Sequence, residues 1–180
     1  IYKYFGDKQS LFLACVRHSL ELLDATLREA VPEGADAETS IRALVPALIA
    51  AARQHGNYNV LYNEITSGSC REFAPELARE IESRTAQLYT RLFETAKEDG
   101  ALAPGLAPEA AAFFFDNLLM MLQFSYSCDY YQHRMRLYCG ENADWNDEMM
   151  ADQLTRFLLG AMRGEGSCNI SLPTTSEPPA

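Results

Sequence analysis

The sequence predicts an all-α fold in one helical domain, and three observations support this prediction. Apolar residues recur every three or four positions over long stretches, as they do along one face of a helix. Runs of β-branched residues are few, and no Asn-Gly or Asp-Gly turn joins two segments of alternating polarity. The 180 residues, of which 48% are hydrophobic, are enough to bury one core.

The first helix is expected to begin at Asp7, because a short carboxylate at that place accepts hydrogen bonds from the free N–H groups of a first helical turn. Apolar residues follow at helical spacing from Phe12 to Leu27. The segment VPEG at 31–34 is typical of a turn and ends the helix.

A second helix is indicated by the apolar stripe that runs from Ile41 to Ala52, with Pro46 inside it. A proline in a helix interior removes a backbone hydrogen bond and bends the helix, whereas a proline in the first turn is well tolerated. The sequence leaves both possibilities open, a bent helix through Pro46 or a helix that begins there. A short helical segment, YNVLYNEI, follows HGN at 55–57.

Two prolines mark the starts of the next two helices. Pro75, within REFAPEL, opens a long helix that ends near Gly100. Pro108 opens the next helix, which is expected to run over 108–138. The last helix follows an acidic cap region, and its acidic first turn, with Asp144, Asp147 and Glu148, suits the positive end of a helix dipole. Its apolar stripe consists of Met150, Leu154, Phe157, Leu158 and Ala161.

Helix 108–138 carries polar residues on one narrow edge and apolar residues on two faces. A helix of a single domain usually buries one apolar face, so two faces predict central burial or contact with a second molecule. We expect one face to line a ligand chamber and the other to contact a second subunit. The first face holds Phe113, Asn117, Met121, Phe124 and Cys128, and the second holds Phe115, Leu119, Leu122 and Tyr126.

The charge of the chain excludes one broad class of function. A formal net charge of -10 at pH 7 repels a polyphosphate, so the chain as a whole is not a nucleic-acid-binding surface. Any contact with DNA must be local. The opening residues, with Lys3 and Lys8 against Asp7, are where the local charge permits such a contact.

The cysteines and the hydropathy predict a cytoplasmic protein. The five cysteines are widely spaced, form no C-x-x-C pair and are odd in number, which argues against a disulfide framework. The opening segment does not have the charged, apolar and small-residue order of a signal peptide. No apolar run approaches the ~20 residues of a membrane span.

The common enzyme motifs are absent from the sequence. It contains no phosphate-binding G-x-x-x-x-G-K-[ST], no zinc-binding H-E-x-x-H and no G-x-S-x-G nucleophile elbow. None of the three histidines follows a glutamate by three positions, as a di-iron helical bundle requires. Asp129 and His133 lie one turn apart, but an intrahelical ion pair explains that spacing and no third ligand is visible. We therefore expect no catalytic residue, no metal and no cofactor.

The opening segment IYKYFGDKQSLFLACV resembles the end of the helix-turn-helix unit in the tetracycline-repressor (TetR) family of bacterial transcription regulators. In that family the recognition helix finishes with an aromatic cluster, which is followed by a small residue, a capping residue and a lysine that starts the next helix. Those places are filled here by Ile1, Tyr2, Tyr4, Phe5, Gly6, Asp7 and Lys8. REFAPEL is also similar to the phrase that often opens the long helix of the family's body.

The resemblance implies a division of the chain into three parts. Residues 1–6 would end a DNA-binding helix-turn-helix, residues 7–163 would form a helical ligand-binding and dimerisation domain, and residues 164–180 have the composition of a flexible tail. The base-reading residues would precede Ile1. Side chains that would contact phosphates beside a major groove are Tyr2, Tyr4 and Lys8.

The resemblance also implies a homodimer in which the last two long helices form a four-helix bundle with their copies. Each subunit would then present the broad apolar faces of these helices to the other. The expected interface residues are Phe115, Leu119, Leu122, Tyr126, Met150, Leu154, Phe157, Leu158 and Ala161.

The predicted function is a ligand-responsive DNA-binding regulator, and specifically a repressor. A small, partly apolar effector would bind in the body and favour a spacing of the two DNA-reading heads unlike the ~34 Å between successive major grooves. The net negative charge favours a cationic effector only weakly. The alternative is a helical small-molecule-binding or assembly protein without a DNA role. The expected ligand contacts are Tyr62, Tyr89, Phe93, Asn117, Met121, Phe124 and Cys128.

Overall fold

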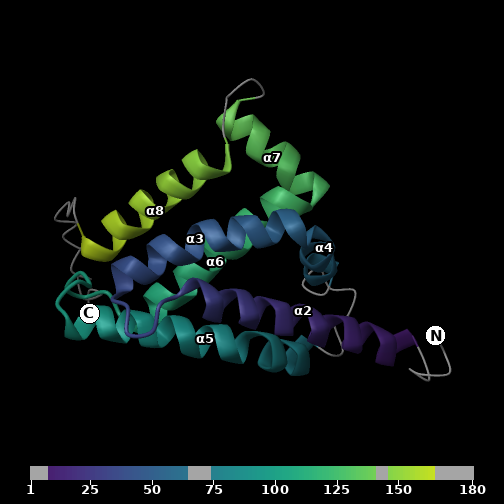
Figure 1. Cartoon of the computed structure of the whole chain (residues 1–180), viewed down its shortest axis with the longest axis horizontal. Coiled ribbons are helices and arrows are strands. Elements are labelled where there is room, and N and C mark those ends of the chain that lie inside the picture. The colour runs from purple at the N-terminus through teal and green to yellow at the C-terminus, as the bar shows by residue number, and fades with distance from the viewer. Residues whose placement is uncertain (1–7, 65–73, 141–145, 165–180) are drawn as a thin grey trace, which may run out of the picture.

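The described parts of the chain are helices joined by short connections. The computed structural model describes residues 8–64, 74–140 and 146–164 (Figure 1). These ranges contain seven helices and no strand, which confirms the predicted all-α class. The helices are α2 (Lys8–Ala30), α3 (Ala37–Gln54), α4 (Gly56–Glu64), α5 (Ala74–Glu98), α6 (Pro108–Ser127), α7 (Asp129–Cys139) and α8 (Asp147–Arg163).

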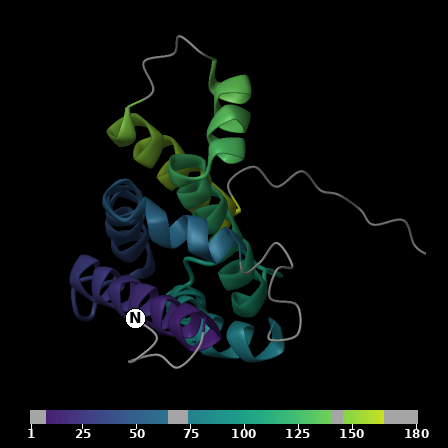
Figure 2. The same ribbon diagram turned by 90° about the vertical axis from the view of Figure 1, so that its right-hand side faces the viewer.

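Helix α3 lies at the centre of the fold, with α7 and α8 on one side of it and α2 and α5 on the other (Figures 1 and 2). It packs against α2, α5, α6 and α8. Its apolar stripe supplies the most deeply buried residues, of which Ile41, Leu44 and Val45 have no exposed surface. None of the described helices combines the length and the apolar character that a membrane crossing needs.

Pro46 lies inside α3, which begins at Ala37 and continues through the proline. Of the two possibilities that the sequence left open, a helix start at Pro46 is therefore wrong. The proline occupies an exposed position on the helix surface, where its ring does not disturb the buried stripe.

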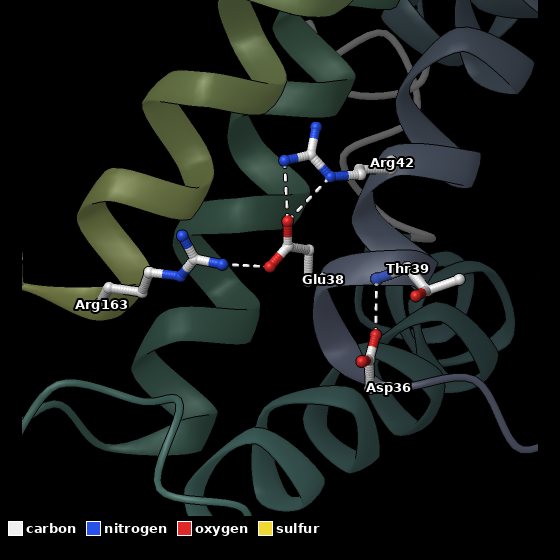
Figure 3. A network of polar contacts seen from close by, with 5 residues as sticks. All are labelled: Asp36, Glu38, Thr39, Arg42 and Arg163. Carbon is white, nitrogen blue, oxygen red and sulfur yellow. Dashed lines mark hydrogen bonds and ion pairs between the residues drawn. The ribbon is translucent and has the colours of Figure 1, made fainter.

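The first turn of α3 is capped and is linked to the end of α8 (Figure 3). The side chain of Asp36 accepts a hydrogen bond from the backbone N–H of Thr39 at 2.7 Å, and this bond lowers the pKa of Asp36. Glu38 accepts from the guanidinium of Arg42 at 2.7 Å and also from that of Arg163. One carboxylate therefore joins the start of α3 to the last turn of α8.

A second polar link joins the end of α3 to the start of α8. The guanidinium of Arg53 contacts the carboxylate of Asp147 at 2.8 Å and lies over the ring of Tyr126, 4.5 Å from its centroid. Burial and the nearby negative charge of Asp147 raise the pKa of Tyr126 to about 12. Tyr126, an expected interface residue, is thus engaged by a cation of its own chain.

The predicted helix 108–138 is two helices, because the chain leaves helical geometry at Cys128, where φ is -109° and ψ is 128°. The hydroxyls of Ser125 and Ser127 donate to the backbone carbonyls of Met121 and Gln123 at 2.9 and 3.0 Å. Such bonds compete with the regular backbone pattern near a helix end. Helix α7 then leaves the body at a new angle and contributes no buried residue (Figure 1).

The face of α6 that was expected to meet a second subunit lies instead in the core of the chain itself. Phe115 is only 1% exposed and packs edge-on against Tyr89 and Phe93, with ring centroids 4.9 and 5.6 Å apart. Leu119 is buried in the same cluster. These side chains have no surface left for a second molecule, which corrects their assignment to the dimer interface.

The other expected interface residues divide into three groups. Leu158 is buried in the core, so its assignment to the interface is corrected in the same way. Phe157 and Ala161 are exposed on α8. The half-buried residues that pack against the core are Leu122, Tyr126, Met150 and Leu154.

Replacing Phe115 with alanine should lower the free energy of unfolding by about 3–5 kcal/mol, because the change leaves a cavity between α5 and α6. Leu137 of α7 is 83% exposed, so the control Leu137→Ala should change it by less than about 0.5 kcal/mol. Urea unfolding followed by circular dichroism measures both values. Equal losses in the two variants would contradict the assignment of Phe115 to the core.

Candidate ligand-binding cavity

A cavity of about 100 Å³ lies among α2, α3, α4, α5 and α6. Helices α2, α4, α5 and α6 each place several side chains around it, and α3 contributes Ala51. Glu82, Thr85 and Tyr89 of α5 recur at i, i+3 and i+7, and therefore share one face of that helix. Leu20, Leu23, Tyr58, Asn59, Tyr62, Asp116, Met120, Gln123 and Phe124 also line the cavity.

Two carboxylates face the cavity without a cation among its described lining residues. Glu82 accepts a hydrogen bond from the hydroxyl of Tyr62. Asp116 makes no hydrogen bond or ion pair with any described residue. Burial first, and then the negative charge of Glu82, raise the pKa of Asp116 from its usual 3.8 to about 6.

The hydroxyl of Tyr89 is a second polar group that faces the cavity without a partner. Tyr89 is 2% exposed and lines the cavity, and its hydroxyl makes no hydrogen bond within the described part of the chain. No fully buried side-chain nitrogen or oxygen in that part lacks a partner, so this oxygen must reach the cavity space. Burial, and then the charges of Asp116 and Glu82, raise the pKa of Tyr89.

Other polar side chains of the lining are satisfied by the protein itself. Thr26 donates to the carbonyl of Leu22 at 2.9 Å, and Thr85 donates to that of Glu82 at 3.1 Å. The amide of Asn59 donates to Ser127 at 2.8 Å. Asp116 and Tyr89 differ from these groups, because their polar atoms remain available to a molecule that enters the cavity.

Three of the seven expected ligand contacts line the cavity, namely Tyr62, Tyr89 and Phe124. The rings of Tyr62 and Phe124 lie 5.8 Å apart and form part of one wall. Phe93 is buried in the core against Phe115, away from the lining. Its assignment as a ligand contact is corrected accordingly.

The other three expected contacts also lie outside the cavity lining. The amide of Asn117 finds a partner in its own helix by donating to the carbonyl of Phe113 at 2.7 Å. Met121 is half-buried on the same side of α6 as Asn117. Cys128 is buried at the end of α6, where burial raises the pKa of its thiol.

Asp116 and Glu82 line the cavity but are not among the ligand contacts expected from the sequence. On a helical wheel Asp116 lies on the narrow polar edge of helix 108–138, but a single acid within AAAFFFDNLLMM is itself a signal of an unusual environment. Glu82 carries no such signal, because it is one of several charged residues in α5. Only the packing of α5 against α6 brings the two acids to one cavity.

The expected DNA contacts Tyr2 and Tyr4 lie outside the described residues, and so do segment 1–6 and residues 165–180. Lys8 is the first residue of α2, and its side chain is not among those described. No family model matches the chain, and no curated protein matches it. The functional argument therefore depends on the cavity and the surfaces around it.

Replacing Asp116 with asparagine should stabilise the protein above pH 6 and leave it unchanged below pH 4. The folded state holds the Asp116 proton more tightly than the unfolded state, so the wild-type chain loses stability as the pH rises from about 4 through 6. An amide does not ionise, and the gain at pH 8 should be on the order of 1–2 kcal/mol after solvent screening.

Urea unfolding at pH 4 and pH 8 measures this difference. Glu94→Gln, an exposed carboxylate on α5, is the matched control and should show no gain at either pH. A D116N variant that gains as much at pH 4 as at pH 8 would show that ionisation is not the cause.

Proposed function

We propose that the chain is the ligand-binding and dimerising body of a DNA-binding transcription regulator, a cytoplasmic repressor whose effector occupies the cavity. The observation that carries the proposal is that α2 forms one wall of this cavity, with Leu20, Leu23 and Thr26 among the lining residues. Helix α2 begins at Lys8, directly after the segment that resembles the end of a helix-turn-helix. A ligand in the cavity therefore contacts the helix that leads to that segment.

The packing of α2 supports the proposal that a ligand in the cavity shifts this helix and thereby the DNA-reading unit. Leu27, in its last turns, belongs to the main core. Val16, in its first half, belongs to a small separate cluster with neighbours that include Leu61 and Tyr62 of α4. The described apolar contacts of this first half belong to the small cluster, so we expect a ligand between α2 and α4 to shift it at small energetic cost.

The proposed dimer uses the outer sides of α6 and α8. Phe113, Phe114 and Leu118 of α6 are exposed, and Phe157 of α8 is 63% exposed. Large apolar side chains that are exposed on a subunit favour contact with a second molecule. The proposed four-helix bundle is thus formed by α6 and α8 with their copies, as the sequence analysis expected. A different face of α6 would contact the second subunit.

The alternative, a small-molecule-binding or assembly protein without a DNA role, uses the same cavity and the same exposed rings. DNA binding separates the two. The complete gene product, incubated with random duplex DNA, is expected to enrich a two-fold symmetric site with half-sites about one helical turn apart. A compound that raises the melting temperature of the 180-residue chain should then release that DNA. Failure to enrich any sequence would favour the alternative.

Replacing Phe157 with glutamate should convert the dimer to a monomer without loss of helicity, because the side chain is exposed in the subunit and buried only between subunits. Sedimentation equilibrium measures the mass, and circular dichroism measures the helicity. Ala25→Glu, which adds the same charge to an exposed position of α2, should remain a dimer.

Leu158→Glu provides the contrast, since it should unfold the chain by placing a charge in the core. An unchanged dimer in the Phe157→Glu variant would remove α8 from the proposed interface.

A further inference from the structure

We propose that the cavity selects a small organic ammonium ion, a cation that carries N–H donors on a short apolar body. This inference rests on the ligand-binding part of the proposed function, and it names the chemical class of the effector. Its basis is a set of three polar groups in one cavity, contributed by Glu82, Tyr89 and Asp116.

The charge of the cavity favours a cation over a neutral or anionic molecule. Glu82 and Asp116 both face it, and no lysine or arginine is among the described lining residues. A half-buried carboxylate without a counter-charge is costly, because the protein replaces only part of its hydration. A cation bound between the two acids would offset this cost, whereas an anion would add to it.

The hydrogen-bonding pattern favours an ammonium with N–H donors over a quaternary ammonium. A primary ammonium has three donors, and the cavity offers three unlike acceptors: the free carboxylate of Asp116, the second oxygen of Glu82 and the hydroxyl oxygen of Tyr89. Bonds from an ionised donor to a carboxylate are roughly twice as strong as neutral ones. A quaternary ammonium carries the charge but satisfies none of these acceptors.

The remaining walls and the volume limit the body of the ligand. Tyr62 and Phe124 form an aromatic wall, and Met120 and Leu20 add aliphatic surface. The cavity volume of about 100 Å³ is smaller than the ~150 Å³ of a cavity that holds benzene. An amine of about five heavy atoms fits such a volume, and aromatic faces also attract its charge.

The test compares four probes of similar size: butylammonium, butan-1-ol, tetramethylammonium and butyrate. Their binding to the 180-residue chain at pH 8 is measured by chemical-shift titration. Butylammonium is expected to bind at least about tenfold more tightly than butan-1-ol or tetramethylammonium, and butyrate is expected not to bind. Equal affinities for butylammonium and butan-1-ol, tighter binding of butyrate, or no binding of butylammonium would each overturn the proposal.

Two substitutions assign the preference to named atoms. Asp116→Asn should abolish the preference for butylammonium over butan-1-ol without weakening butan-1-ol itself, and Tyr89→Phe should weaken butylammonium several-fold. Glu94→Gln, on the exposed side of α5, is the control and should leave all affinities unchanged. A preference that survives in D116N would overturn the role of this carboxylate.

The affinity of the wild-type chain for butylammonium should also fall as the pH drops through 6. The titratable groups that face Asp116 across the cavity are His55 of the α3 end, Tyr58 and Tyr62 of α4, and Glu82 and Tyr89 of α5. The D116N variant tests this assignment, because a pH dependence that it retains unchanged does not arise from Asp116.

These outcomes separate the inference from the function on which it rests. If butan-1-ol binds as tightly as butylammonium, the cavity still takes a ligand and the regulator proposal stands without the cation. If the complete gene product binds no DNA, the regulator proposal fails and the preference for an ammonium is unaffected.

Discussion

The division of α6 into three sides is the constraint on which the rest of the structure depends. One side, with Phe115 and Leu119, packs into the core against α3 and α5. A second side, with Asp116 and Phe124, borders the cavity. The third leaves Phe114 and Leu118 exposed. The helix is apolar nearly all round because each of its sides meets apolar surroundings or exposes aromatic rings. A substitution on one side need not disturb the other two.

The cavity keeps two acids close together at an energetic cost that a purely structural core would avoid. Apolar side chains of similar size at the positions of Glu82 and Asp116 would pack the same helices without burying charge. The aromatic edge contacts of Phe115 with Tyr89 and Phe93 hold α5 against α6 beside this site. A rigid α5–α6 wall with uncompensated charge is the arrangement expected of a binding site whose partner supplies the missing cation.

Helix α2 connects this wall to the start of the chain through two unequal attachments. Its last turns share the main core with α3, while its first half is held mainly through Val16 in the small cluster with α4. The α2 residues that line the cavity run from Ser19 to Thr26. They lie between Val16 of the small cluster and Leu27 of the main core. In the proposed regulator, a ligand in the cavity would contact α2 between its residues in the main core and those in the small cluster.

The sequence by itself determined the all-α class and most helix boundaries, because helical periodicity and the Pro and Gly breaks are local properties of the chain. It also identified the aromatic part of the cavity, through Tyr62, Tyr89 and Phe124. The break at Cys128 was missed, since no proline or glycine marks it.

Only the tertiary structure decided which apolar face meets the core, which meets a cavity and which stays exposed. Periodicity shows that a residue is shielded from water, but it does not show which neighbouring helix or molecule shields it. For the same reason Phe115 and Phe113, equally apolar in the sequence, have opposite surroundings. The pairing of Glu82 with Asp116 likewise arises from the packing of α5 on α6, which joins residues that are far apart in the chain.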